Sequence, residues 1–227
     1  MNKSLDTSIF IADVCGTLFY DDTTLGLLAH HFSRQPDRLW RLRVLKSMTV
    51  RYSPLRLSTM ILERLTRKHL LKHLLVRMLA NDTVVSLEDS AQEYAVWLLK
   101  EKKVDSVWEI LDPALKKQQV ILASASLEPV IAALSERLGL QYVSSELESL
   151  DGVLTGYYRN DLTGKKIQAL NTMIGYDFND NQYDAISDNL TDYNLLNGAR
   201  KAFVVLHNES HRERWLGLNA TYLRLKE

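Results

Sequence analysis

Short apolar segments that end in polar residues recur along this chain, with helix-like segments between them. The first segment is Ile9-Phe10-Ile11-Ala12, which ends at Asp13 and is followed by a glycine turn. A short, partly β-branched run of this kind is typical of a strand that is buried on both faces of a parallel sheet. Further strands are expected at residues 120–123, 141–143, 185–186 and 202–206.

The intervening segments have helical periodicity and helix-capping residues. Ser126 can cap a helix that stops at Gly139, a second helix is expected over 165–174, and a third over about 189–198. Strands that alternate with helices imply parallel strands joined by right-handed crossovers. We therefore predict an α/β fold with a Rossmann-like, doubly wound parallel sheet. Residues 152–158 alternate in polarity, which favours a small hairpin.

The segment 20–112 lacks convincing strand patterns and is rich in helix formers. Apolar side chains at positions 71, 74, 75, 78 and 79 repeat at helical spacing. We expect an α-helical insertion cap over 20–112 and an α/β core formed by 1–19 and 113–227. An insertion at this point of the chain can cover a site at the edge of the sheet.

Composition excludes several classes of protein. The single cysteine, Cys15, cannot form an intramolecular disulfide. No apolar run reaches the ~18 residues that a membrane-spanning helix needs, and the first residues contain no apolar signal core. These features favour a cytoplasmic protein. We find no nucleic-acid-binding motif and therefore expect no nucleic-acid partner. Nothing in the sequence indicates the oligomeric state.

Positive charge is concentrated in the segment 34–77, although the whole chain has a net charge of zero. Twelve basic and two acidic residues give this segment a net charge of +10. The simplest interpretation is a solvated helical face. The alternatives are a basic lid that attracts phosphorylated substrates, or peripheral contact with an anionic membrane.

Polar residues at the ends of the expected strands mark a candidate site. Open α/β sheets bind ligands beyond the carboxyl ends of their strands. The polar residues at or just after these strand ends are Asp13, Cys15, Thr17, Ser124 and Asp188. Two further residues, Lys166 and Asp192, lie in the helices next to them.

The types of these residues suit phosphoryl transfer. A carboxylate such as Asp13 can attack phosphorus and form an acyl phosphate. The phosphate dianion repels this carboxylate, so the reaction needs cations. Mg²⁺ prefers oxygen ligands and keeps several waters, and Asp13 and Asp188 are suitable ligands, while Asp192 can hold the metal or its waters. Lys166 can neutralise both the nucleophile and the phosphate.

Hydrogen-bond donors for the phosphate oxygens are available at the same strand ends. Ser124 and Thr17 offer hydroxyl groups, and the backbone amides that follow Asp13 can cradle the transferring group. The expected ligand is therefore a small phosphorylated substrate.

Four stretches resemble the motifs of the haloacid dehalogenase superfamily, and they occur in the order of that family. They are I-F-I-A-D-V-C-G-T-L-F, V-I-L-A-S-A-S, G-K-K-I-Q-A-L and A-I-S-D-N-L-T-D. The stretch D-G-V-L-T-G at 151–156, and a Lys166 followed four residues later by Leu170, resemble the phosphoserine-phosphatase-like branch, which also carries a helical cap after the first motif.

This resemblance implies roles for individual residues. It implies that Asp13 is the nucleophile, that Lys166 and Ser124 assist it, and that Asp188 and the backbone carbonyl of Cys15 bind Mg²⁺ together with Asp13. The residues that it implies for phosphate binding are Cys15, Gly16, Thr17, Ser124, Ala125 and Lys166. The expected activity is Mg²⁺-dependent hydrolysis of a phosphomonoester through an aspartyl-phosphate.

The sequence departs from the family pattern at Cys15, where the phosphatases have a second Asp that protonates the leaving oxygen. A thiol is a poor acid–base group for oxygen at neutral pH, and losing such a group typically costs ~10² to 10⁴ in rate. Three alternatives follow: a slow phosphatase with another acid, a phosphotransferase or dehalogenase-type relative, or a phospho-ligand-binding protein without turnover. A phosphatase of lipid phosphates at a membrane surface is a minor variant of the first.

Overall fold

The computed structural model describes residues 8–49, 70–175 and 182–225. A seven-stranded sheet lies at the centre, with strand order β4-β3-β2-β1-β5-β6-β7. All neighbouring strands are parallel except β3 and β4, which pair antiparallel as a hairpin. The strands are β1 (Ile9–Ala12), β2 (Gln119–Leu127), β3 (Gln141–Leu150), β4 (Val153–Asn160), β5 (Tyr183–Ser187), β6 (Lys201–Leu206) and β7 (Thr221–Arg224). The predicted α/β fold with a Rossmann-like sheet is confirmed.

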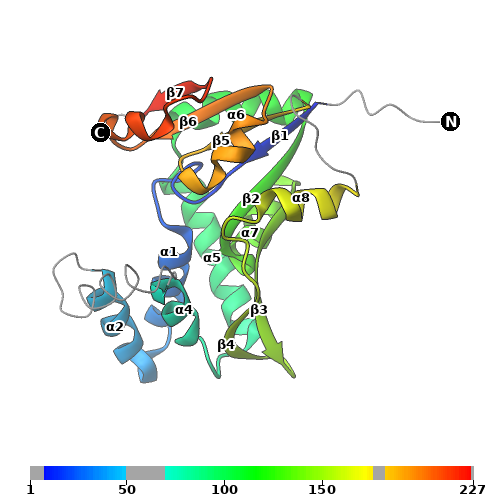
Figure 1. Cartoon of the computed structure of the whole chain (residues 1–227). Helices are drawn as coiled ribbons and strands as arrows, with labels where there is room; N and C mark the ends of the chain where they lie inside the picture. The colour runs from blue at the N-terminus through cyan, green and yellow to red at the C-terminus, as the bar shows by residue number, and fades with distance from the viewer. Residues whose placement is uncertain (1–7, 50–69, 176–181, 226–227) are drawn as a thin grey trace.

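Helices cover both faces of this sheet (Figure 1). The α-helices are α1 (Thr23–Ser33), α2 (Leu39–Thr49), α4 (Leu70–Arg77), α5 (Val84–Glu101), α6 (Asp105–Lys117), α7 (Glu128–Leu138), α8 (Lys166–Ile174) and α9 (Tyr193–Asn197). The 3₁₀ helices are η1 (Pro36–Arg38), η2 (Leu190–Asp192) and η3 (Glu209–Trp215).

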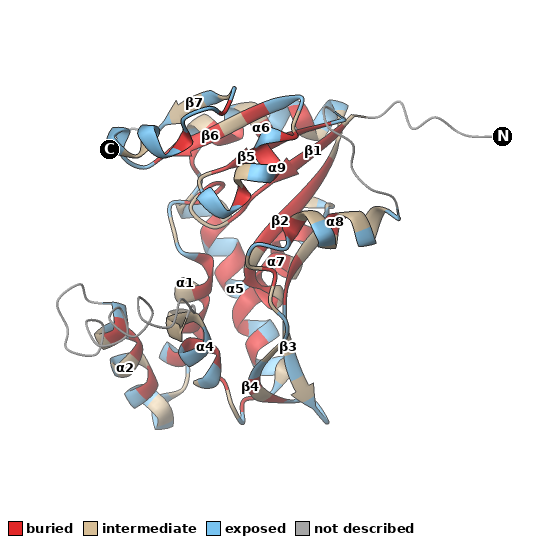
Figure 2. Ribbon diagram, viewed as in Figure 1, coloured by how far each residue is buried: buried red, intermediate tan, exposed pale blue. Residues whose placement is uncertain are grey.

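Strand β1 shows why the sheet is buried on both sides. Phe10 and Ala12 belong to an apolar cluster shared with α5, α6 and α7, whereas Ile9 and Ile11 belong to a second cluster shared with α8, α9 and β6. Successive side chains of a strand point to opposite faces. The continuous apolar run of β1 therefore contributes side chains to both apolar clusters. Figure 2 shows the buried residues along the central strands.

The segment 20–112 is helical in its described part, apart from short turns and isolated bridges. Figure 1 shows α2 and α4 away from the central strands, whereas α1 contacts β2. Helix α4 lies against β4, whereas α5 packs on α7 and α1. The division into a core and a cap at residues 20 and 112 stays a prediction.

The start of α7 differs from the expectation that Ser126 caps it. Strand β2 continues to Leu127, which occupies the N-cap position without a side-chain hydrogen bond, and Pro129 stands in the first turn. The Ser126 hydroxyl instead lies 2.6 Å from that of Thr23, at the start of α1. Gly139 ends α7 at a φ of 67°, as predicted.

The basic segment is partly neutralised by ion pairs. Arg38 and Arg41 bind Asp82, while Arg34 binds Glu93 and Lys72 binds Asp161. Residues 51, 56, 64, 67 and 68, which carry part of the counted charge, lie outside the described residues. Contact with an anionic membrane stays a prediction. No helix of the described residues is long and apolar enough to cross a membrane.

Asp82 is the centre of a buried ionic cluster, which yields a stability prediction. Its carboxylate oxygens lie 2.6 Å from the guanidinium groups of Arg38 and Arg41 and 3.2 Å from Nε2 of His31. Asp82→Asn should lower the free energy of unfolding by about 3 kcal/mol, because Arg41 is buried and loses its counter-ion. Urea denaturation of the two proteins measures this difference.

The pH dependence supplies a second readout of the same cluster. Burial tends to raise the pKa of Asp82, but the hydrogen bonds of His31 and Arg41 outweigh it and lower the pKa. The resulting stabilisation is present above the unfolded-state pKa of ~3.9 and is lost as the pH falls below it. Glu93→Gln, in an exposed pair, is the matched control and should cost under ~1 kcal/mol. Equal midpoints for Asp82→Asn and wild type would contradict the prediction.

Candidate active site

Asp13 stands at the carboxyl end of β1, between β2 and β5, and is almost fully buried. Its backbone amide donates to the carbonyl of Ile186, which extends the sheet pairing by one residue and fixes the strand end. A cavity of about 770 Å³ opens beyond this end and is lined by Asp13 together with residues of five other segments. The strand order of the sheet therefore places the predicted nucleophile, Asp13, beside a cavity.

Lys166 connects three separate segments at this point. Its ammonium lies 2.7 Å from Asp13 and 2.6 Å from Asp192, and all three side chains are buried. Burial opposes the charge on Lys166, but Asp13 and Asp192 outweigh it and raise its pKa. The lysine is therefore held charged beside Asp13, whereas the preceding Lys165 stands at the N-cap position of α8.

Thr17 and Asp188 complete the surroundings of the Asp13 carboxylate. The Thr17 hydroxyl lies 3.0 Å from Asp13 and 2.9 Å from Asp188, and it accepts a hydrogen bond from the amide of Asp188. One hydroxyl proton serves both carboxylates, so the threonine fixes their separation. Gly16 is required here, since its φ is +71° and a Cβ would lie 2.6 Å from Asp188 Oδ2.

The predicted site residues lie close together, but only some of them line the cavity. Those that line it are Asp13, Cys15, Gly16, Ser124, Ala125, Lys166 and Asp188. Thr17 and Asp192 lie behind this lining, where Asp192 also accepts a hydrogen bond from Ser187 at 2.7 Å. Both are placed to orient other site residues. The hydroxyl of Ser124 accepts from the amide of Ser126 at 3.2 Å, so its own proton is available to a ligand.

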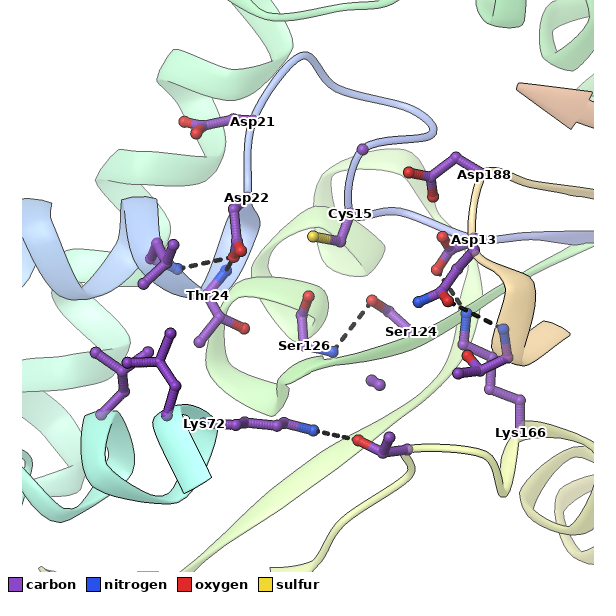
Figure 3. A pocket seen from close by; sticks show the side chains of 18 of the residues that line it. Asp13, Cys15, Asp21, Asp22, Thr24, Lys72, Ser124, Ser126, Lys166 and Asp188 are labelled. Atoms are coloured by element: carbon purple, nitrogen blue, oxygen red, sulfur yellow. Dashed lines mark hydrogen bonds and ion pairs between the residues drawn. The ribbon is translucent and has the colours of Figure 1, made fainter. Parts of the chain in front are cut away.

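Figure 3 shows how the labelled side chains surround the cavity. Asp13 and Asp188 lie together on one side, and Asp21 and Asp22 lie on the other. The sulfur of Cys15 points toward the side of the cavity on which Asp22 lies. A group bound near Asp13 therefore has the thiol as a neighbour and the two acids farther along.

The electrostatics of the site favour a bound cation. Burial raises the pKa of Asp13 to about 7 against the effect of Lys166, and the charges of Asp192 and Asp188 add to this rise. The negative charges of Asp188 and Asp192 thus act on Asp13, only two of these three carboxylates contact Lys166, and a divalent cation would relieve the repulsion. Asp13, Asp188 and the carbonyl of Cys15 could hold Mg²⁺, which needs few protein ligands because it keeps several waters.

A different kind of metal centre is not supported by the described residues. Among residues 8–49, 70–175 and 182–225, no three His, Cys, Asp or Glu side chains are arranged as a metal-binding group. Zinc sites usually have three or four such ligands. The possible ligands named above are oxygen donors, which Mg²⁺ prefers.

Cys15 cannot supply the proton that the second Asp of related phosphatases supplies. Burial raises the pKa of its thiol to about 12, and the charge of Asp22 adds to this effect. The thiol stays protonated at neutral pH and is too weak an acid to protonate a departing oxygen efficiently. The Asp13 carboxylate has its paired cation, whereas position 15 offers no acid–base group that could act at neutral pH.

Some residues of the cavity were not identified from the sequence. His207 directly follows β6, and its Nε2 lies 3.0 Å from Asp188 Oδ2. His207 could have been identified from the sequence, because it directly follows an apolar strand, as Asp13 does. Lys72 reaches the cavity from α4 and binds Asp161 and Thr163. The sequence included this lysine only in the basic segment 34–77 and did not show its contacts, because its partners lie 89 and 91 residues away.

Three comparisons place the fold among known proteins. A structure of a protein with unknown function from Bordetella pertussis Tohama I is 17% identical, with a TM-score of 0.69 over 97% of this chain and 100% of that chain. An apo phosphoserine phosphatase is 13% identical, with a TM-score of 0.55 over 96% and 94%. A phosphoserine phosphohydrolase-like protein from Francisella tularensis subsp. tularensis SCHU S4 is 18% identical, with a TM-score of 0.55 over 95% and 94%.

At these identities the structural likeness shows the fold alone, and no curated protein matches the sequence. The family comparison is more direct. The model of the haloacid dehalogenase-like hydrolases matches residues 10–197, which include Asp13, Ser124, Lys166 and Asp188. This chain therefore belongs to the family of haloacid dehalogenase-like hydrolases.

Proposed function

We propose that the protein hydrolyses a small phosphomonoester through an aspartyl-phosphate on Asp13. The observation that carries this proposal is the buried Asp13 carboxylate at the base of the cavity, 2.7 Å from the ammonium of Lys166. A carboxylate paired with a buried cation can approach a phosphate dianion that would otherwise repel it. The related fold of phosphoserine phosphatase supports the same reaction class.

The proposed reaction has two steps. In the first, an oxygen of Asp13 attacks phosphorus, the bond to the ester oxygen breaks, and the leaving oxygen takes a proton from solvent. In the second, water attacks phosphorus and gives a proton to solvent, and the bond between phosphorus and the Asp13 oxygen breaks, which releases inorganic phosphate and restores the Asp13 carboxylate. Bound Mg²⁺ would supply positive charge for the phosphoryl oxygens.

Other side chains support these steps. Ser124 donates its hydroxyl proton to a phosphoryl oxygen, and Lys166 offsets the charge of the phosphate and of Asp13. Asp192 and Ser187 hold the lysine and its partner in place. Thr17 keeps Asp13 and Asp188 at a fixed separation.

Asp13→Asn tests the nucleophile. The amide cannot form the acyl phosphate, so phosphate release from a panel of phosphomonoesters with Mg²⁺ should fall at least ~10²-fold, the scale of loss when a catalytic group is removed. Lys165→Met, at the neighbouring N-cap position, is a control for changes near the site and should retain the wild-type rate. Equal phosphate release by wild type and Asp13→Asn would overturn the mechanism.

Cys15→Asp tests the missing acid. An added carboxyl group at this position should raise hydrolysis of unactivated alkyl phosphates by about 10²-fold, because their alkoxide leaving groups need a proton. The gain should be much smaller with p-nitrophenyl phosphate, whose leaving group needs none. Cys15→Ser is the matched control, since it adds polarity without an acid. No gain would mean that another group already supplies the proton.

A phospho-ligand-binding protein without turnover is the second candidate, and the raised pKa of the Cys15 thiol favours it. Such a protein should bind phosphate analogues in the presence of Mg²⁺, detected by calorimetry, while releasing no phosphate from any member of the panel. A dehalogenase-type relative should release halide without Mg²⁺. Phosphate release that depends on both Mg²⁺ and Asp13 separates hydrolysis from these alternatives.

A further inference from the structure

A second cavity lies beside the first and has a different lining. It measures about 560 Å³ and is formed by α1, α2, α5 and the two residues before α1. Its apolar wall consists of Leu25, Ala29, Leu45, Tyr94 and Trp97. Cavities of this volume and character hold small organic groups in many proteins. None of these residues has a role in the phosphoryl-transfer steps.

The two cavities share three lining residues, Asp21, Asp22 and Leu25. Figure 3 places Asp21 and Asp22 on the side of the first cavity opposite Asp13 and Asp188. A molecule with its phosphate at Asp13 would therefore extend past these two acids to reach the second cavity. This arrangement links the apolar space to the leaving-group side of the proposed reaction.

The aromatic wall of the second cavity is preformed. The Tyr94 hydroxyl donates to Asp21 at 2.7 Å, and its ring stacks on Trp97 with centroids 5.6 Å apart. Tyr94 lies so close to α1 that a Cβ on Gly26 would be 1.8 Å from its hydroxyl oxygen. Trp97 remains 40% exposed, so part of this large ring is free to contact a ligand.

The charge between the cavities is negative. Asp22 accepts hydrogen bonds from the amides of Thr24 and Leu25, and Asp21 accepts from Tyr94. Within the described part of the chain, neither carboxylate forms an ion pair. Lys72 lines the first cavity near enough to Asp22 for their charges to interact, but its ammonium is hydrogen-bonded to Asp161 and Thr163. Lys46 lines the second cavity from α2, but it is exposed to solvent. A cationic group at the junction would complement the two acids.

We propose that the substrate is a phosphomonoester of an amino alcohol with an apolar or aromatic body, which occupies the second cavity while its ammonium lies beside Asp21 and Asp22. This inference rests on the proposed function, because it names the leaving group of that reaction. The apolar body contributes affinity through burial, and the ammonium contributes charge complementarity. Small phosphate esters fill only the first cavity.

Four esters with a common phosphate test the two parts separately. They are ethyl phosphate, O-phosphoethanolamine, 3-phenylpropyl phosphate and 2-amino-3-phenylpropyl phosphate. We expect kcat/KM to rise about tenfold or more on adding the phenyl group, and several-fold on adding the ammonium. The ester with both groups should be the best of the four. Absence of either gain would overturn the inference.

Ala29→Phe fills the second cavity and should lower the ratio of kcat/KM for 2-amino-3-phenylpropyl phosphate over O-phosphoethanolamine about tenfold. Val85→Phe is the matched control, because Val85 is 64% exposed on α5 and does not line either cavity. It should leave the ratio unchanged. An unchanged ratio in folded Ala29→Phe, verified by circular dichroism, would overturn the inference.

Binding of the phosphonate analogue of the best ester provides a readout that needs no turnover. Its binding should change the fluorescence of Trp97, and the change should be absent in Trp97→Phe. If wild type hydrolyses none of the esters but shows this binding, the proposed hydrolysis fails and the second cavity is still a ligand site. If small esters are hydrolysed and the phosphonate leaves Trp97 unaffected, the hydrolysis stands and the inference fails.

Discussion

The ion pairs of Lys166 with Asp13 and Asp192 are the interaction on which the site depends. They join the end of β1, the first turn of α8 and the 3₁₀ helix η2 through charges that are all buried. Buried charges are tolerated only when they are paired and hydrogen-bonded. The same contacts that make this burial tolerable place a cation beside the carboxylate, so the stability of the core and the reactivity of Asp13 have one physical origin.

The replacement at Cys15 shows that the surroundings of the nucleophile and the proton supply to the leaving group are separable. Asp13 keeps its lysine, its threonine and its neighbouring carboxylate, and none of these contacts involves the Cys15 side chain. In the proposed reaction, the high pKa of the thiol would affect only the departure of the alcohol. The chain retains the paired charges around Asp13, and the proposed hydrolysis should depend on how easily the alcohol leaves without help.

The sequence predicted the parallel sheet and the strand ends because both follow from local patterns. Asp13 and Asp188 end apolar runs, and the carboxyl ends of parallel strands meet at one edge. The local pattern did not show which polar residues face the cavity, so Thr17 and Ser124 looked alike, although Thr17 lies behind the lining. Strand β7 was missed because Thr221–Arg224 is short and only half-buried. Ser126 was assigned to a helix cap because its sequence position fits both a cap and a strand end.

The second cavity could not be predicted from the sequence, because local patterns do not show which side chains border a cavity. Leu45, Tyr94 and the residues of α1 each belong to an amphipathic helix, and their spacing is the same whether they pack against each other or border a cavity. The close approach of Tyr94 to Gly26, together with the polar contacts of His30 and His31 with α5, sets the separation of α1 and α5 and the space that remains. The second cavity, which the proposed reaction assigns to the leaving group, is thus determined by long-range packing, whereas the surroundings of Asp13 are determined by strand ends that local sequence patterns indicate.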